Sequence, residues 1–299
     1  MAAPLPDVTL AIPAAPPLPD LVNARQLRTQ RLGRALRLWV PAGVLILMLA
    51  MCFLLPLVIT LPSSTKGDIL VNNEPPFSPG HWLGTDVQGT DIFSQLVYGG
   101  QVAFEVGLAV TAIGFIIGGT LGVIAGYSTG WADAFISRVL DILIAFPALV
   151  LALVIAQGLG PSEFHVILAL SAFGIPAIGR IARGATLTVR ALPYMTAAEL
   201  AGTRRWRIIA RHVVPNIVPQ LVTFALLGIG ITIILEGALD FLGYGIPAPT
   251  ASWGNMIANG QQILSAQPEY IVIPSIALLI TVASLNMVGD ALRERWGVQ

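Results

Sequence analysis

The residues with the chemistry of a binding or reactive site are few, and most are carboxylates beside apolar runs. Asp141, Glu236 and Asp240 are the candidates for a pathway or gate. An ionisable group near the end of an apolar span usually faces protein or water rather than lipid. For Glu236 a second interpretation stays open, in which the carboxylate ends a helix and is only solvated at the membrane interface.

A metal or catalytic centre has little support in the sequence. His81, Asp86 and Asp91 share one polar loop and are potential metal ligands, but loop carboxylates more often cap turns and helices. There is no H-E-x-x-H, no G-x-S-x-G and no paired intramembrane aspartate, and His165 and His212 are isolated. We therefore expect no metal, no catalytic residues and no enzymatic activity in this chain.

The single lysine, Lys66, decides how ATP could act on the protein. It stands in Ser-Ser-Thr-Lys-Gly-Asp, which is not the G-x-x-x-x-G-K-[ST] pattern of a phosphate-binding loop. If ATP drives the protein, a partner subunit must bind it. The single cysteine, Cys52, lies in an apolar run and allows no intrachain disulfide.

A basic, amphipathic stretch from residue 180 to residue 216 separates two long apolar runs. Thr196 and Glu199 have the T-x-x-E spacing of a capping box, which predicts the start of a short helix. Gly202 supplies the left-handed backbone state that ends a helix, and Thr203 can cap a second helix that Pro215 stops. The pattern predicts a helix, a glycine turn and a second helix.

The second of these helices has two faces. Apolar residues at helical spacing form one of them: Trp206, Ile209 and Val213. Arginines form the other: Arg204, Arg207 and Arg211. One face is expected to rest on protein or lipid while the other meets acidic partners. The alternative is an interfacial helix whose arginines touch lipid headgroups.

The elements that must position these residues are membrane helices. Of the 299 residues 55% are hydrophobic and only 11% are charged. With a mean hydropathy of +0.79, the chain is expected to be an all-α integral membrane protein. A formal net charge of zero gives no indication of nucleic acid. Residues 1–37 are expected to be a disordered, basic, cytoplasmic segment and residues 38–61 a first transmembrane anchor.

The rest of the chain is expected to form an outer loop and a five-helix core. The loop, residues 62–101, should carry a short interfacial helix capped by Thr90. The core, residues 102–299, should include a loop at 183–216. Six spans are expected in all: 38–61, 102–127, 136–155, 164–181, 217–239 and 270–291. Both termini should be cytoplasmic, because every arginine then falls near the cytoplasmic side and only Lys66 lies outside.

Glycines and prolines indicate how these spans pack. A repeated G-x-x-x-G ridge in the second span should let another helix approach its backbone closely, through Gly114, Gly118, Gly122 and Gly126. Prolines inside later spans predict bent helices around a cavity: Pro147, Pro176 and Pro274.

The basic loop resembles a known motif. Ala197, Ala198, Gly202 and Pro215 match the cytoplasmic "EAA" loop of binding-protein-dependent ABC importer permeases. In that family the loop fits a groove on the ATPase subunit. The family usually has Glu where this chain has Thr196, and Glu199 is a local substitute for it.

The outer loop carries a second resemblance. The run from His81 to Gly99 is similar to the H-P-L-G-T-D-x-x-G-R-D-x-x-S-R-L-x-Y-G signature of the "C"-type dipeptide, oligopeptide and nickel permeases, with Thr90 in place of Arg. The similarity continues through residues 138–147, 211–216, 236–256 and 286–293. Glu105 and Asp240 fall where the family is apolar or small and polar.

The resemblance implies an ABC importer permease with six transmembrane helices in a bacterial inner membrane, taking up peptides or related solutes. It implies a homologous second permease, two ATPase subunits that bind ATP and Mg²⁺, and an extracytoplasmic substrate-binding protein. The ATPase-coupling residues it implies are Thr196, Ala197, Ala198, Glu199, Gly202, Arg204, Trp206, Arg207, Arg211 and Pro215. The alternative is a self-contained secondary transporter or channel, which should show mid-membrane ionisable relays or inverted repeats.

Overall fold

The arginine-rich stretch before the first span is helical. The computed structural model describes residues 24–265 and 267–297, so residues 1–23 of the expected disordered segment lie outside it. Helix α1 (Ala24–Leu49) includes residues 24–37, for which the expectation of disorder is wrong. Arginine favours helices, and no proline interrupts residues 24–40. The chain divides into two units, residues 1–36 and 37–299, and all later elements belong to the second.

Five helical stretches in the described residues are long and apolar enough to cross a bilayer. They are Leu36–Val58, Ile92–Tyr127, Glu163–Arg190, Arg205–Phe241 and Glu269–Trp296. Each overlaps a span predicted from the sequence. The described part of the chain holds isolated β-bridges but no strand, which confirms the all-α class.

Three of these stretches contain a π turn, in which the helix is locally wider. The first continues from α1 through Ala50–Leu54 into α2 (Leu55–Val58). The second joins α3 (Ile92–Ile113) to α4 (Gly119–Tyr127), and the fourth joins α9 (Arg205–Ile208) to α10 (Val214–Phe241). The third and fifth are the single helices α7 (Glu163–Arg190) and α12 (Glu269–Trp296).

The expected span at 136–155 is broken. Helices α5 (Trp131–Ala145) and α6 (Ala148–Leu159) meet at an angle of 89°. Phe146 is extended, as the residue before a proline tends to be, and Pro147 becomes the N-cap of α6 rather than an interior residue. Pro176 and Pro274 do lie inside helices, as predicted.

The predicted glycine ridge is confirmed, and α7 is the helix that approaches it. A Cβ atom on Gly118 would overlap the carbonyl oxygen of Ile175, and one on Gly122 would overlap that of Gly179. Only glycine lets two backbones come so close. The second stretch, Ile92–Tyr127, and α7 thus pack side by side with their main chains in contact.

The helix expected on the outer loop is the beginning of α3. This helix runs without a break from Ile92 into the second span, so the separate interfacial helix is wrong. Its N-cap is Asp91, whose carboxylate accepts from the Ser94 N–H at 2.7 Å, and not Thr90. A carboxylate is the better cap here because it also accepts from the Ser94 hydroxyl.

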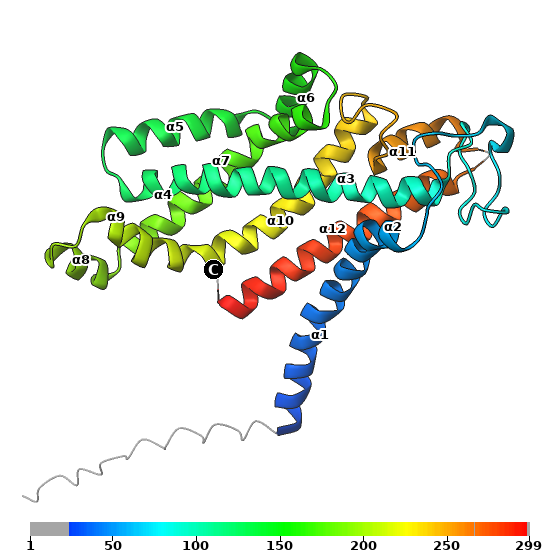
Figure 1. The fold of residues 1–299 in the computed structure, drawn as a ribbon. Coiled ribbons are helices and arrows are strands. Elements are labelled where there is room, and N and C mark those ends of the chain that lie inside the picture. Colours follow the sequence, from blue (N-terminus) through cyan, green and yellow to red (C-terminus); the bar gives the residue numbers. More distant parts are fainter. Residues whose placement is uncertain (1–23, 266, 298–299) are drawn as a thin grey trace, which may run out of the picture. The chain divides into compact units, whose positions relative to one another are not determined.

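The two ends of the helix bundle differ in what they carry. One end bears α8 (Pro193–Leu200) and α9, and the opposite end bears α11 (Trp253–Gly260) with the long loop that precedes α3 (Figure 1). We call them the α8–α9 end and the α11 end. The helix pair α9–α10 runs over 37 residues from one towards the other.

Candidate functional site

The basic loop folds as a helix, a glycine turn and a second helix, as the sequence predicts. Helix α8 ends at Leu200, and Gly202 has a φ of 75°. The N–H of Gly202 donates to Glu199 and the N–H of Thr203 donates to Ala198, the paired bonds of a Schellman turn. Gly202 therefore lets the chain reverse while the last carbonyls of α8 stay satisfied.

The helix starts differ from the prediction. Helix α8 begins at Pro193, three residues before Thr196, so Thr196 and Glu199 do not form a capping box. Proline suits the first helical position because its missing N–H would have no partner there. Helix α9 has Arg204 rather than Thr203 at its N-cap, without a side-chain hydrogen bond.

Pro215 does not stop the second helix. It lies in the first turn of α10, and the helix continues through the π turn at Ile209–Val213 to Phe241. Within residues 183–216 only 191–192 and 201–204 are non-helical. The structure therefore joins the second short helix rigidly to a membrane span.

The buried anchors of the loop are Met195 and Ile208, which the sequence analysis missed. Both are almost inaccessible and pack with Val189, Val213 and Ile217 at the end of the bundle. Trp206, placed on the apolar face by spacing, is 60% exposed. Ile208 takes the inward position because the π turn that follows it changes the helical repeat.

Four arginines in and next to α9 are exposed and lack acidic partners within the described residues. They are Arg204, Arg205, Arg207 and Arg211. Arg207 lies over the ring of Trp206, with its guanidinium carbon 5.3 Å from the ring centre. The carboxylate of Glu199 instead accepts from the Tyr127 hydroxyl at 3.1 Å, which connects α8 to the end of α4.

Asp141 is the one gate candidate in an ion pair. Arg180 on α7 donates to it at 2.6 Å, and the two side chains are 59% and 49% exposed. About two turns nearer the start of α5, Asp133 receives two hydrogen bonds from Arg183, at 2.6 and 2.9 Å. These two pairs fasten α5 to α7.

Glu236 and Asp240 lie one turn apart on α10 and are both 1% exposed, so a solvated interfacial Glu236 is wrong. In the part of the chain that the structure describes, Oε1 of Glu236 is buried and has no hydrogen-bond partner. Among the described residues, neither Glu236 nor Asp240 forms an ion pair with a cation.

Asp240 also fixes the loop at residues 242–252. One carboxylate oxygen accepts from the Ile246 N–H at 2.6 Å and the other accepts from the Ser252 hydroxyl. Asn255 then donates its side-chain amide to the Ile246 carbonyl at 2.8 Å. The end of α10 is thereby tied to α11.

Asp86 is the corresponding centre of the loop before α3. Its carboxylate accepts from the N–H groups of Gln88 and Thr90 at 2.8 Å each. It also accepts from the Gln95 amide at 2.7 Å and the Tyr270 hydroxyl at 3.3 Å. Three N–H donors and a hydroxyl thus surround this carboxylate, so Asp86 ties the loop to α3 and α12.

His81 likewise serves the cap of α3, since its Nδ1 lies 2.9 Å from the Asp91 carboxylate. In the part of the chain that the structure describes, no cluster of three or more metal-ligating side chains occurs. His165 contacts the Gly160 carbonyl, and His212 lies beside the ring of Tyr194.

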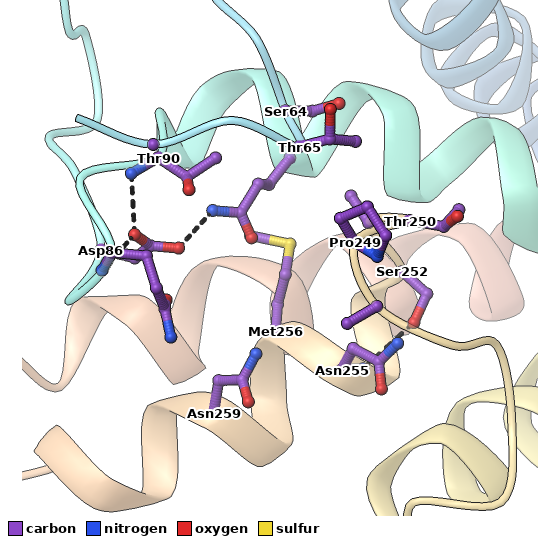
Figure 2. A pocket seen from close by; sticks show the side chains of 15 residues that line it. Ser64, Thr65, Asp86, Thr90, Pro249, Thr250, Ser252, Asn255, Met256 and Asn259 are labelled. Carbon is purple, nitrogen blue, oxygen red and sulfur yellow. Dashed lines mark hydrogen bonds between the residues drawn. The ribbon is translucent and has the colours of Figure 1, made fainter. Parts of the chain in front are cut away.

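A polar pocket of about 280 Å³ lies between these two carboxylate centres at the α11 end. Figure 2 shows Asp86 and Thr90 on one side and Ser252, Asn255 and Asn259 on the other. Its polar side chains are hydroxyls and amides apart from Asp86, and Pro249 and Met256 add apolar surface. The pocket can hydrogen-bond to a polar chain but offers no free charge.

Comparison with known proteins identifies the family of the chain. Residues 118–295 match the family described as "Binding-protein-dependent transport system inner membrane component". The chain belongs to this family. It is therefore an inner-membrane transport component rather than an enzyme.

Named relatives resemble it over most of both chains. The glutathione transport system permease protein GsiD of Pectobacterium atrosepticum is 39% identical, over 74% of this chain and 73% of its own. The probable D,D-dipeptide transport system permease protein DdpC of Escherichia coli is 39% identical, over 85% and 84%. A putative peptide transport system permease protein of Brucella suis is 35% identical, over 95% and 96%.

Solved structures share the fold. An inward-facing structure of the MetNI methionine ABC transporter matches with a TM-score of 0.56 at 19% identity, over 69% of this chain and 96% of that one. A structure titled as an amino acid ABC transporter with histidines matches with a TM-score of 0.54 at 14% identity, over 67% and 94%. The ABC permease fold that the sequence predicts is thus confirmed.

Proposed function

We propose that this chain is a permease subunit of an ATP-driven importer that takes up peptides. An extracytoplasmic binding protein delivers the peptide, and a homologous second permease completes the pathway. Two ATPase subunits bind ATP and Mg²⁺, since the one lysine lies outside any phosphate-binding loop. The support for a peptide substrate is that relatives at 35–39% identity are named as peptide or glutathione permeases.

The observation that carries the proposal is the exposed basic loop at the α8–α9 end. In and next to α9 it holds four exposed arginines that have no acidic partner among the described residues, and Met195 and Ile208 anchor it to the bundle. A surface that is charged, ordered and unpartnered fits docking to an acidic protein groove. We assign it to the ATPase, with residues 196–199, Gly202, Arg204, Trp206, Arg207, Arg211 and Pro215 as the coupling element.

Helix α10 is the element that carries the motion. Its rigid connection to α9 means that a displacement of the coupling loop must move α10 as a body. Near the other end of α10, Asp240 accepts hydrogen bonds from the loop that lines the polar pocket. When ATP closes the ATPase subunits at one membrane face, the movement of α10 thereby transmits this change to the face where the binding protein docks.

Asp141 and Glu236 remain our candidates for the pathway or gate, with Asp240 as the residue that positions the outer loop. Asp141 is half exposed inside a helix pair that passes as a membrane span, so it faces water or protein rather than lipid. Replacing Glu236 by Gln keeps the size and hydrogen-bonding capacity of the side chain but removes its charge. Peptide uptake and coupled ATP hydrolysis at wild-type rates in Glu236→Gln would remove the gate assignment.

The first test measures ATP hydrolysis. The purified chain in lipid should hydrolyse no ATP, and activity should appear when the ATPase subunits of the same importer are added. Uptake of labelled di- and tripeptides into vesicles should then require both ATP and the binding protein. Hydrolysis by the isolated chain, or uptake without the ATPases, would overturn the proposal.

The second test fixes orientation. Cys52 is buried, so single cysteines can be added to the natural chain with little background labelling. Ser64→Cys and Asn255→Cys should react with an impermeant thiol reagent in intact cells, and Thr203→Cys should react only after the cells are opened. Labelling of Thr203→Cys from outside would place the coupling loop on the wrong face.

A further inference from the structure

A cavity of about 450 Å³ lies between the coupling loop, by which we mean α8, residues 201–204 and α9, and the body of the bundle. It forms where α4 ends, where α7 ends and where α8 turns into α9. Its polar lining comes from two arginines, four hydroxyl side chains and one carboxylate: Arg190, Arg205, Tyr127, Ser128, Thr129, Thr203 and Glu199. We call it the seam cavity. Its volume falls in the range of pockets that hold small molecules.

The charge in the seam cavity favours an anion. Arg190 lies over the ring of Tyr127 and makes one long contact to the Ser128 carbonyl, at 3.5 Å. Neither contact neutralises it. Among the described residues Arg205 has no acidic partner. Glu199 is the only acid in the lining, and it accepts from the Tyr127 hydroxyl.

Two guanidinium groups and several hydroxyls are the donors that a phosphate group requires. Arginine binds phosphate through two parallel N–H bonds, and hydroxyls supply further donors to the remaining oxygens. Arg190 belongs to the bundle and Arg205 to the coupling loop. A single phosphate held by both would bridge the two parts.

The depth of the cavity in the membrane indicates that the phosphate group belongs to a lipid rather than to a soluble molecule. The second span ends at Tyr127, within the cavity lining. Trp131, a few residues further on, is 81% exposed. Exposed tryptophans at the end of a span mark the headgroup region of a bilayer. The seam cavity therefore opens at the depth where lipid phosphates lie.

We propose that the seam cavity binds the phosphate group of an anionic membrane lipid and thereby ties the coupling loop to the bundle. Basic pockets between membrane helices are known sites for such headgroups. The inference goes beyond transport and concerns only residues of this chain. Arg205 would serve the lipid, whereas the arginines assigned to the ATPase are Arg204, Arg207 and Arg211.

The test is lipid binding to the purified full-length chain, measured by native mass spectrometry during titration with phosphatidylglycerol. Arg205→Gln should weaken the binding about fivefold, the effect expected for one basic residue at an anionic headgroup. Arg211→Gln is the matched control, because it removes the same charge from the π turn that follows α9 but lies outside the cavity lining. It should bind phosphatidylglycerol like the natural chain.

Three results would overturn the proposal. Equal loss in Arg205→Gln and Arg211→Gln would show general charge attraction, and unchanged binding in Arg205→Gln would show that the cavity is not the site. Displacement of the lipid by an equal concentration of soluble glycerol phosphate would assign the site to a soluble anion. If Arg205→Gln does not fold, Arg205→Lys replaces it, and binding weaker than in the natural chain is the expected result. These measurements need no ATPase, so they succeed or fail independently of the importer assignment.

Discussion

The two ends of the bundle hold their charges in opposite ways. At the α11 end, Asp86 and Asp240 are 3% and 1% exposed, and their oxygens are occupied by donors of the same chain. At the α8–α9 end, four arginines are exposed and have no acidic partner in the described residues. The charges at the α11 end are thus satisfied within the chain, whereas the charges at the α8–α9 end are free to meet a partner molecule.

This difference indicates that the two ends of the bundle have different roles. Buried carboxylates that accept hydrogen bonds on both oxygens are costly to disturb, so they fix the loops that line the polar pocket. Exposed charges contribute little to stability but much to partner choice. Changes at the α11 end should therefore lower the stability of the fold, and changes at the α8–α9 end should alter assembly.

The strongest test of this contrast is Asp86→Ala. The substitution leaves two backbone N–H groups and the Gln95 amide without their acceptor, while the Tyr270 hydroxyl can still donate to Gln95 Oε1. We expect a loss of at least about 3 kcal/mol in the free energy of unfolding, because buried donors are left unpaired. Thermal unfolding in detergent measures it. The exposed carboxylate in Asp68→Ala is the control, and a similar loss in both would contradict the contrast.

Asp240→Ala should have the next largest effect. It removes the acceptor for the Ile246 N–H and the Ser252 hydroxyl, and we expect a loss of about 2 kcal/mol. Asp240→Asn keeps an acceptor for Ile246 and should cost less than half as much. Increased hydrogen exchange at residues 242–252 in Asp240→Ala is the local readout. If Asp240→Asn and Asp240→Ala lose equal stability, the hydrogen bonds are not the cause.

Gly202→Val tests the α8–α9 end. A Cβ atom there meets nothing within 4 Å, so the cost is conformational, roughly 1–2 kcal/mol for the left-handed backbone state. The larger effect should be on coupling, because a straightened turn would misplace Arg204 and Trp206. Co-purification of the ATPases and peptide uptake should both fall, with Ala201→Ser unaffected. Normal association and uptake in Gly202→Val would show that the turn is not the coupling hinge.

Arg207→Gln should have the smallest effect on the stability of the fold. It therefore best separates an effect on assembly from an effect on stability. The side chain is exposed, so the free energy of unfolding should change by less than about 0.5 kcal/mol. Association with the ATPase should weaken, and its dependence on salt should become shallower. Titrating the complex with salt measures both. If Arg207→Gln lowers the free energy of unfolding but leaves the salt dependence of ATPase association unchanged, Arg207 serves the fold and not the partner, which would contradict the contrast.

The sequence by itself determined the features that depend on local residue order. Apolar runs predict the spans because a bilayer requires about twenty apolar residues in a helix. The ridge of glycines in the second span predicts a close helix contact, and Gly202 predicts a left-handed turn, because both follow from the missing Cβ atom. The motifs from Thr196 to Pro215 and from His81 to Gly99 correctly indicated the family.

Only the tertiary structure decided which partner each polar or apolar side chain meets. Spacing predicted a capping box for Glu199 and put Trp206 on the apolar face of its helix, but the Tyr127 hydroxyl donates to Glu199 and Ile208 is the buried residue. Glu236 could have been solvated or buried, and the burial of α10 among its neighbours settled it. The physical reason is that helical periodicity fixes which residues share a face, whereas the neighbouring helices fix which face is covered.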